Sequence, residues 1–189
     1  MNNRYIGELA TDVYGLTLNE MRLGHIRYTA AQAATSDADG LLDGHVLGAA
    51  VAVVDEFLNP MPYARNVTVV ASADTTAKVT IRGKDLSGAL ISEELTLNGA
   101  TPVVGVTAFA SVESVVMPIK TGSETVDLGW GELIGLPFKL SAAPLHWVLD
   151  DGAAASAAAF TANATVLSKN VVDFNGSLNG SVMDLFLVL

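Results

Sequence analysis

The sequence feature that most constrains this chain is a period-two alternation of apolar and polar residues within the segment 65–99. In the stretch 77–82, Val79 and Ile81 fall on one side of an extended strand, and polar residues fall on the other. After a glycine-containing turn, the stretch 90–97 repeats the alternation. Together with the Val- and Thr-rich run that precedes them, these stretches predict a three-stranded antiparallel meander.

One residue departs from the alternation. Glu93 falls on the apolar side of its stretch, beside Ile91 and Leu95. A carboxylate on a core face predicts either a β-bulge at this point or a position at the rim of the sheet.

Further short apolar runs are separated by glycine, proline and asparagine. They predict strands at 46–54, 108–117, 125–130, 145–149, 171–174 and 182–189. The run 46–54 is expected to be a buried strand, and the glycine-punctuated stretch 129–137 a loop. Asp150-Asp151-Gly152 and the stretch 175–180 are typical of turns.

The alanine-rich stretch 153–159 favours helix by propensity, yet its surroundings favour a poor strand or a loop. With roughly nine to eleven short strands at regular spacing, the chain is predicted to be all-β, an antiparallel β-sandwich of jelly-roll or Ig-like type. The sandwich domain is assigned to residues 45–189.

Residues 1–44 are the least regular part and are predicted to form an N-terminal arm. Leu9, Val13 and Leu16 have helical spacing, but nearby glycines weaken any helix. The stretch 30–44 is small and polar, as loops are. An alternative interpretation makes this region a set of edge strands of the main domain.

Three of the four tyrosines, Tyr5, Tyr14 and Tyr28, lie in this arm. Tyrosine is rigid and enriched at interfaces, so these three residues are the candidate interface anchors of the sequence. The arm is expected to be mobile in the free protein or to reach onto a neighbouring subunit.

Charge and composition exclude several classes. Twenty acidic residues against ten basic ones give a net charge of −10, which disfavours nucleic acid and anionic membranes as partners. The absence of cysteine excludes disulfides and thiolate metal sites. No apolar run approaches the ~20 residues of a transmembrane helix, and the first residues lack the apolar core of a signal peptide. We therefore expect a soluble protein that the general secretory route does not export.

Candidate catalytic and metal-ligating residues are sparse. His25, His45 and His146 are scattered without a ligand spacing. Asp37 and Asp39 begin an acidic stretch that lacks the spacing and closing glutamate of an EF-hand loop. No serine lies in a nucleophile elbow, and no glycine-rich stretch carries a phosphate-loop lysine. We expect no enzyme activity, no cofactor and no bound metal.

Several phrases resemble a family of tailed-bacteriophage virion proteins. They are PYARNVT (62–68), SEELTLNG (92–99), AFASVESVVMP (108–118), VDLGWGELIGLPFKL (126–140) and VVDFNGSLNGSVMDLFLVL (171–189). The resemblance covers residues 45–189 and implies a β-sandwich structural protein of the phage particle. Within that class it suggests a head decoration (cement) protein bound outside the major capsid shell, and it implies no catalytic residues.

The resemblance implies two partners, the major capsid protein and further copies of the chain itself. Because closed contacts repeat one patch about a symmetry axis, a homotrimer is expected, with a dimer as the alternative. The protein would lie on the outer capsid surface of the virion, and in the host cytoplasm during assembly.

Two other functions stay open: a tail or neck component, and a carbohydrate-binding or adhesin-like module. The latter usually shows exposed aromatic platforms, for which only Trp130 and Trp147 are available among the tryptophans. Trp147 lies in an apolar strand and is expected in the core.

Overall fold

The structure, a computed structural model, describes residues 23–188 except 74, 121 and 177. The prediction of an all-β chain with antiparallel sheets is confirmed. Within the described residues the single helical element is a 3₁₀ turn, η1 (Leu167–Lys169). The same residues include no helix with the length and hydropathy to cross a membrane.

The strands form three sheets, which we name the terminal, long and hairpin sheets. The terminal sheet has the order β1 (Leu23–Tyr28), β14 (Met183–Val188), β10 (Leu145–Asp150), β11 (Ala153–Ala154). The long sheet has the order β12 (Ala159–Thr161), β13 (Val171–Asp173), β9 (Thr125–Gly135), β4 (Arg65–Ala71), β7 (Val103–Val104), with β2 (Asp37–Val46) also paired to β9. The hairpin sheet has the order β3 (Ala52–Val54), β8 (Ser111–Met117), β5 (Lys78–Lys84), β6 (Leu90–Thr96).

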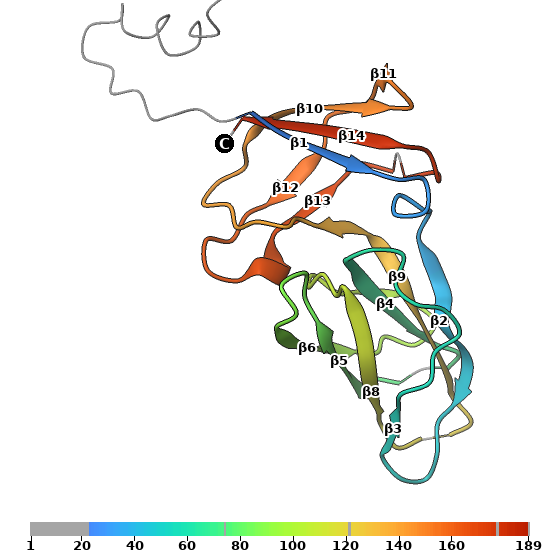
Figure 1. The fold of residues 1–189 in the computed structure, drawn as a ribbon. Helices are drawn as coiled ribbons and strands as arrows, with labels where there is room; N and C mark the ends of the chain where they lie inside the picture. Colours follow the sequence, from blue (N-terminus) through green and yellow to red (C-terminus); the bar gives the residue numbers. More distant parts are fainter. Residues whose placement is uncertain (1–22, 74, 121, 177, 189) are drawn as a thin grey trace, which may run out of the picture.

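Figure 1 shows that these sheets build an elongated molecule with two lobes. The sandwich lobe contains the hairpin sheet packed against β2, β4 and the first part of β9, within residues 37–131. The terminal lobe contains the terminal sheet packed against β12, β13 and the end of β9. Since β1 and β14 pair, the two ends of the described chain lie side by side in the terminal lobe.

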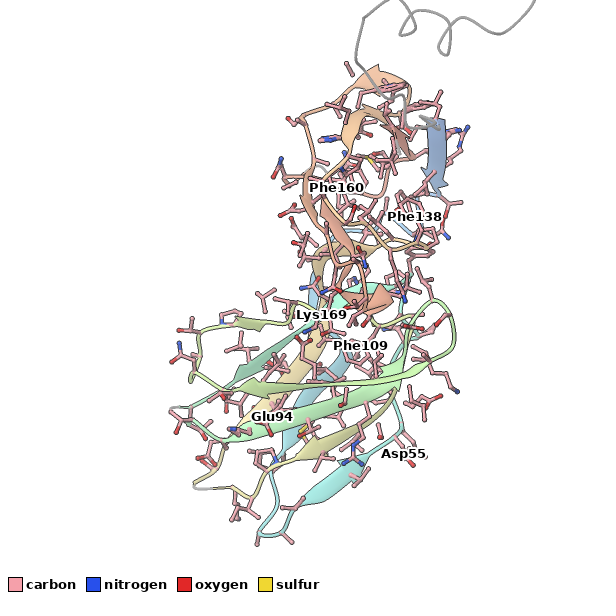
Figure 2. All side chains as sticks on the ribbon, turned by 90° about the vertical axis from the view of Figure 1, so that its left-hand side faces the viewer. Asp55, Glu94, Phe109, Phe138, Phe160 and Lys169 are labelled. Carbon is pink, nitrogen blue, oxygen red and sulfur yellow. The ribbon has the colours of Figure 1, made fainter. Side chains whose placement is uncertain are left out.

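Each lobe has its own apolar core. In the sandwich lobe, Val67 and Val69 of β4 share one cluster with Val79 and Ile81 of β5, so the two sheets face each other across it. In the terminal lobe, the cluster joins residues of β13, β14 and β9, which are Val172, Leu185, Leu187 and Ile134. Figure 2 places Phe109 in the sandwich lobe and Phe138 and Phe160 in the terminal lobe.

Buried polar side chains fix the junction between the lobes. Arg65 is fully buried, and its guanidinium donates to the carbonyl oxygen of Ala34. Burial lowers the pKa of Arg65 to about 10, and the nearby Glu132 carboxylate acts in the opposite direction. Asn66 donates to the carbonyl oxygen of Gly105 and accepts from the amide of Leu133, each at 2.9 Å.

Backbone bonds also cross the junction. The amide of Ala108 donates to the carbonyl of Ser168 at 2.8 Å. The single strand β9 runs without interruption from one lobe to the other (Figure 1). Side-chain and backbone hydrogen bonds and a continuous strand therefore connect the two lobes.

The predicted glycine loop at 129–137 is wrong, because this stretch belongs mostly to β9. A Cβ added at Gly129 would lie 1.8 Å from the backbone carbonyl oxygen of Asp37. A Cβ added at Gly131 would lie 2.5 Å from the side-chain nitrogen Nδ2 of Asn66. Glycine is therefore needed at both positions because neighbouring atoms approach the β9 backbone too closely for a side chain. A glycine in a strand can thus mark a close contact as well as a turn.

The predicted meander is only half right. β5 and β6 form the expected hairpin, but β4 pairs with β9 and β7 in the opposite sheet. The alternation showed which side of each strand is buried and carried no information on which sheet the strand joins. Glu93 takes the predicted rim position without a bulge, since β5 and β6 pair in regular register and its carboxylate accepts from the amides of Val106 and Thr107.

The predicted buried strand at 46–54 is also wrong. β2 ends at Val46, β3 begins at Ala52, and the side chains of Val46, Val51 and Val53 are exposed. By contrast, the stretch 153–159 is free of helix, as expected.

The predicted turns carry the expected backbone. Asp151 and Gly152 have φ values of 47° and 82°, and Asn175 and Gly176 have 53° and 77°. These left-handed conformations are cheapest for glycine, asparagine and aspartate, which are the residues present.

Most of the described part of the predicted arm forms strands, while residues 29–36 are turn and loop, as predicted for the start of the stretch 30–44. Residues 23–28 form β1 at the edge of the terminal sheet, and residues 37–46 form β2 against β9. In this range the structure follows the edge-strand alternative, because both segments have a partner strand that satisfies their backbone groups. Residues 1–22 lie outside the described residues.

Candidate binding surfaces

The two faces of the terminal sheet differ in what they meet. One face lies on the core of its lobe, where Ile26 of β1, Leu185 of β14 and Val148 of β10 stand in one row. The opposite face carries the row His25, Phe186 and Trp147, followed by the row Leu23, Val188 and Leu145. We name these six residues on the outer side of the sheet the aromatic face.

The three rings of the aromatic face form a continuous stack. The rings of His25 and Phe186 have centroids 4.4 Å apart and an interplanar angle of 3°. The rings of Phe186 and Trp147 have centroids 4.9 Å apart and an angle of 6°. His25 Nε2 lies 2.7 Å from Asp184 Oδ1, which fixes the ring at the β1 end of the stack. The stack therefore covers both faces of the Phe186 ring and one face each of the His25 and Trp147 rings.

The aromatic face is apolar and open in the described residues. Leu23 is 65% exposed, Leu145 is 75% exposed and Trp147 is 45% exposed. Single exposed apolar residues are ordinary on protein surfaces, but a contiguous apolar patch marks an interaction site. The patch continues toward a groove of about 440 Å³ lined by residues 138–144 and by Val188.

A second apolar surface lies at the far end of the sandwich lobe. Val46, Val51 and Val53, from the ends of β2 and β3 and the loop between them, are exposed together with Ile119. The amide of Lys120 donates to the carbonyl of Gly48 at 2.8 Å, which joins the two loops. We name these four apolar residues the apolar tip. In Figure 1, β3 lies at the opposite end of the molecule from β10 and β14.

The candidate anchors from the sequence do not form a site in the described residues. Tyr5 and Tyr14 lie outside them. Tyr28 is 1% exposed and packs edge-on against Tyr63 and Phe174, with ring centroids 5.5 and 5.8 Å away. It is a core residue of the terminal lobe, and this position corrects its interpretation as a surface anchor. Burial raises the pKa of the Tyr28 hydroxyl above its ordinary value.

The histidines and acidic residues are also dispersed. His25 lies on the aromatic face, His45 on β2, and His146 on β10, where its Nδ1 lies 3.1 Å from the carbonyl of Pro144. Asp37 and Asp39 lie on β2, and the hydrogen bond between their carboxyl groups raises the pKa of Asp39. Within the part of the chain that the structure describes, no group of three histidine and acidic residues is placed to hold a metal ion.

Sequence reasoning missed Trp147 and Phe186 as surface residues. Their strands, LHWVLD and MDLFLV, are apolar at both odd and even positions. Such strands are usually buried on both faces, and this was the reason to expect Trp147 in the core. One signal in the sequence could have predicted the exposed face. The two strands are apolar on both sides, and the chain has too few further strands to cover both faces of the sheet that they form.

Comparisons with protein-family models, with curated proteins and with solved structures give no match for this chain.

Proposed function

We propose that this protein is a structural component of a tailed-phage particle that decorates and stabilises the capsid from outside. The observation that supports the proposal is the placement of exposed apolar area in two surfaces at opposite ends of an elongated β molecule. A protein whose work is attachment needs such surfaces and a rigid body between them. The resemblance of residues 45–189 to virion proteins supplies the biological class.

The two surfaces have different roles in this proposal. The apolar tip, at the end of the molecule where β2 and β3 are joined, contacts the major capsid protein. The aromatic face serves association within the oligomer, for which we propose a homotrimer. The net charge of −10 keeps free copies soluble and apart from nucleic acid until they meet the shell.

The stack limits the ring area that a carbohydrate ligand can use. Aromatic platforms for sugars offer a ring face to the ligand, and both faces of the central Phe186 ring are covered by His25 and Trp147. Trp130 is 8% exposed, and its indole donates to the carbonyl of Thr35, so it forms no platform.

The test is co-sedimentation with purified heads that lack the protein, followed by cryo-electron microscopy of the particles. We expect the wild-type protein to sediment with heads and to appear on the outer shell. The double variant Val51→Asp/Val53→Asp should lose binding, because charged side chains at the tip resist desolvation. The matched control, Ser92→Asp/Thr96→Asp, changes two exposed residues of β6, at the edge of the hairpin sheet opposite to β3, and should retain binding.

Two results would overturn the proposal. Binding to tails or necks in place of heads would establish the tail component. Equal binding by the tip variant and its control would remove the tip from the interface.

A further inference from the structure

One edge of the hairpin sheet is open along the first part of β8. β3 pairs with residues 115–117 of β8, and no strand of the described residues pairs with residues 111–114 on that side. The chain beyond β3 leaves the sheet as the loop 55–64, whose first residue, Asp55, is labelled in Figure 2. This loop is tied to β2 instead, where the amide of Leu58 donates to the carbonyl of Leu41 at 2.9 Å. The backbone of residues 111–114 is therefore open to a further strand.

A groove of about 310 Å³ lies between this edge and the loop. Residues 57–61 and 110–112 line it, together with Leu41. Phe57, Met61 and Val112 pack in part against the core of the sandwich lobe, so much of the lining is apolar. A groove beside an open strand edge fits an extended peptide, because the peptide backbone pairs with the edge and alternate side chains enter the groove.

A second groove, of about 320 Å³, shares Phe57 and Leu58 with the first. Its other lining residues contribute one apolar, one imidazole and two carboxylate side chains, namely Leu42, His45, Asp43 and Glu56. The side chains of Asp43 and Glu56 are exposed, and neither forms an ion pair within the described residues. A Lys or Arg side chain fits this groove, because its aliphatic stem covers the apolar walls and its cationic head pairs with the carboxylates.

We infer that the two grooves bind an extended, basic peptide segment of a partner protein. An apolar side chain of the segment enters the first groove, a Lys or Arg side chain enters the second, and the backbone pairs with residues 111–114 of β8. The inference does not rest on the virion role, since it follows from the open edge, the two grooves and their unpaired carboxylates. The site shares no residue with the apolar tip or the aromatic face.

The first test measures the fluorescence anisotropy of labelled nonapeptides with the full chain. The probes are an alternating Lys–Val peptide, a Lys–Ser peptide of the same charge and a Glu–Val peptide of opposite charge. We expect the wild type to bind the Lys–Val peptide about tenfold more tightly than the Lys–Ser peptide, because a valine side chain is buried in the first groove. The Glu–Val peptide should bind more weakly than either.

The charge variant is Asp43→Asn/Glu56→Gln. Its matched control, Asp151→Asn/Glu94→Gln, removes the same two charges from exposed residues outside the grooves. At physiological salt we expect the charge variant to weaken Lys–Val binding about three- to tenfold, and the control to change it by less than about twofold, since distant charges are screened.

Amide hydrogen exchange locates the peptide on the wild-type protein, so its outcome does not depend on the folding of a variant. With saturating Lys–Val peptide, amides within residues 111–114 should exchange more slowly, because a paired edge opens less often. Residues 90–96 form β6 at the opposite edge of the same sheet and should keep their exchange rates.

The inference is overturned if the wild type fails to bind the Lys–Val peptide or binds the Lys–Ser peptide as tightly. Equal binding by the charge variant and its control, or unchanged exchange at residues 111–114, would overturn it as well. None of these results bears on binding to phage heads through the apolar tip, so failure here is distinct from failure of the proposed function.

Discussion

The outer faces of the hairpin and terminal sheets make an instructive pair. Both sheets have four strands, and both bury one face on a core. Over β5 and β6 the outer face of the hairpin sheet is polar, with Lys78 and Glu94 in an ion pair at 2.5 Å and Thr80 beside them, whereas its β3 edge carries Val53 of the apolar tip. The outer face of the terminal sheet carries the aromatic stack and two exposed leucines.

This difference indicates that the outer face of the hairpin sheet is stable in contact with water, whereas the outer face of the terminal sheet gains from contact with a partner. A charged, ion-paired surface remains hydrated at no cost, and it resists the dehydration that binding demands. An apolar surface gains free energy when it is covered. We therefore propose the outer face of the terminal sheet as a binding surface, and the following experiments test the contrast between the two faces.

The largest effect is expected from the inner side of the terminal sheet. Leu185 is fully buried, so Leu185→Ala should lower the free energy of unfolding by about 2–5 kcal/mol. Its neighbour Phe186 lies on the aromatic face, and Phe186→Ala should cost less, about 1–3 kcal/mol from the two lost ring contacts. Chemical denaturation measures both. Equal losses would mean that both faces of the sheet are core.

A matched pair of leucines separates the two outer faces. Leu145 on the aromatic face is 75% exposed, and Leu90 on the hairpin sheet is 77% exposed. Leu145→Asp should weaken the contact that covers the aromatic face by about 2 kcal/mol, the value of burying a leucine side chain. Leu90→Asp should weaken nothing. Acrylamide quenching of Trp147, with light scattering at several concentrations, detects the change, and equal behaviour of the two variants would contradict the contrast.

Alkaline pH should destabilise the terminal lobe selectively. The pKa of Tyr28 is raised by burial, so the folded state favours its neutral hydroxyl. The unfolded chain ionises above its ordinary pKa of 10.0, hence this contribution is complete below pH 10 and is lost as the pH rises. The loss amounts to about 1.4 kcal/mol per pH unit. In Tyr28→Phe the loss should be smaller, with a remainder from Tyr63, whose pKa burial also raises.

Thermal unfolding of wild type and Tyr28→Phe from pH 8 to pH 11 measures this difference. Parallel curves for the two proteins would show that Tyr28 ionises in the folded state as it does in the unfolded one.

The smallest effect is expected on the polar face. Lys78→Ala breaks the ion pair with Glu94, whose two side chains are both more than half exposed. Such pairs contribute about 0.2–1 kcal/mol and are screened by salt. Denaturation at low and high ionic strength tests this, and a loss that persists at high salt would indicate a structural role for the lysine.

The sequence was most informative where one face of a strand meets water. Lys78, Thr80 and Arg82 alternate with buried residues, and the hairpin of β5 and β6 followed directly from that pattern. Pairing over long sequence distances, such as β1 with β14, has no local signal. Neither does the choice of sheet for β4, which depends on how the chain crosses between layers.

The aromatic face was not predicted from the sequence, for a different physical reason. Phe186 and Trp147 lie on strands with apolar residues on both sides, and composition alone does not tell a buried second face from an exposed one. Glycines were ambiguous in the same way, because Gly129 serves close packing inside β9 and Gly152 serves a turn. Only the register of the strands distinguishes these cases.

The central claim is that the outer face of the terminal sheet is covered in the working protein and that the outer face of β5 and β6 in the hairpin sheet is not. Hydroxyl-radical footprinting of the wild-type full chain tests it with an internal control, since Leu145 and Leu90 differ by little in exposure, at 75% and 77%. The account predicts that Leu145 is oxidised much more slowly than Leu90. Equal oxidation of the two leucines would contradict it.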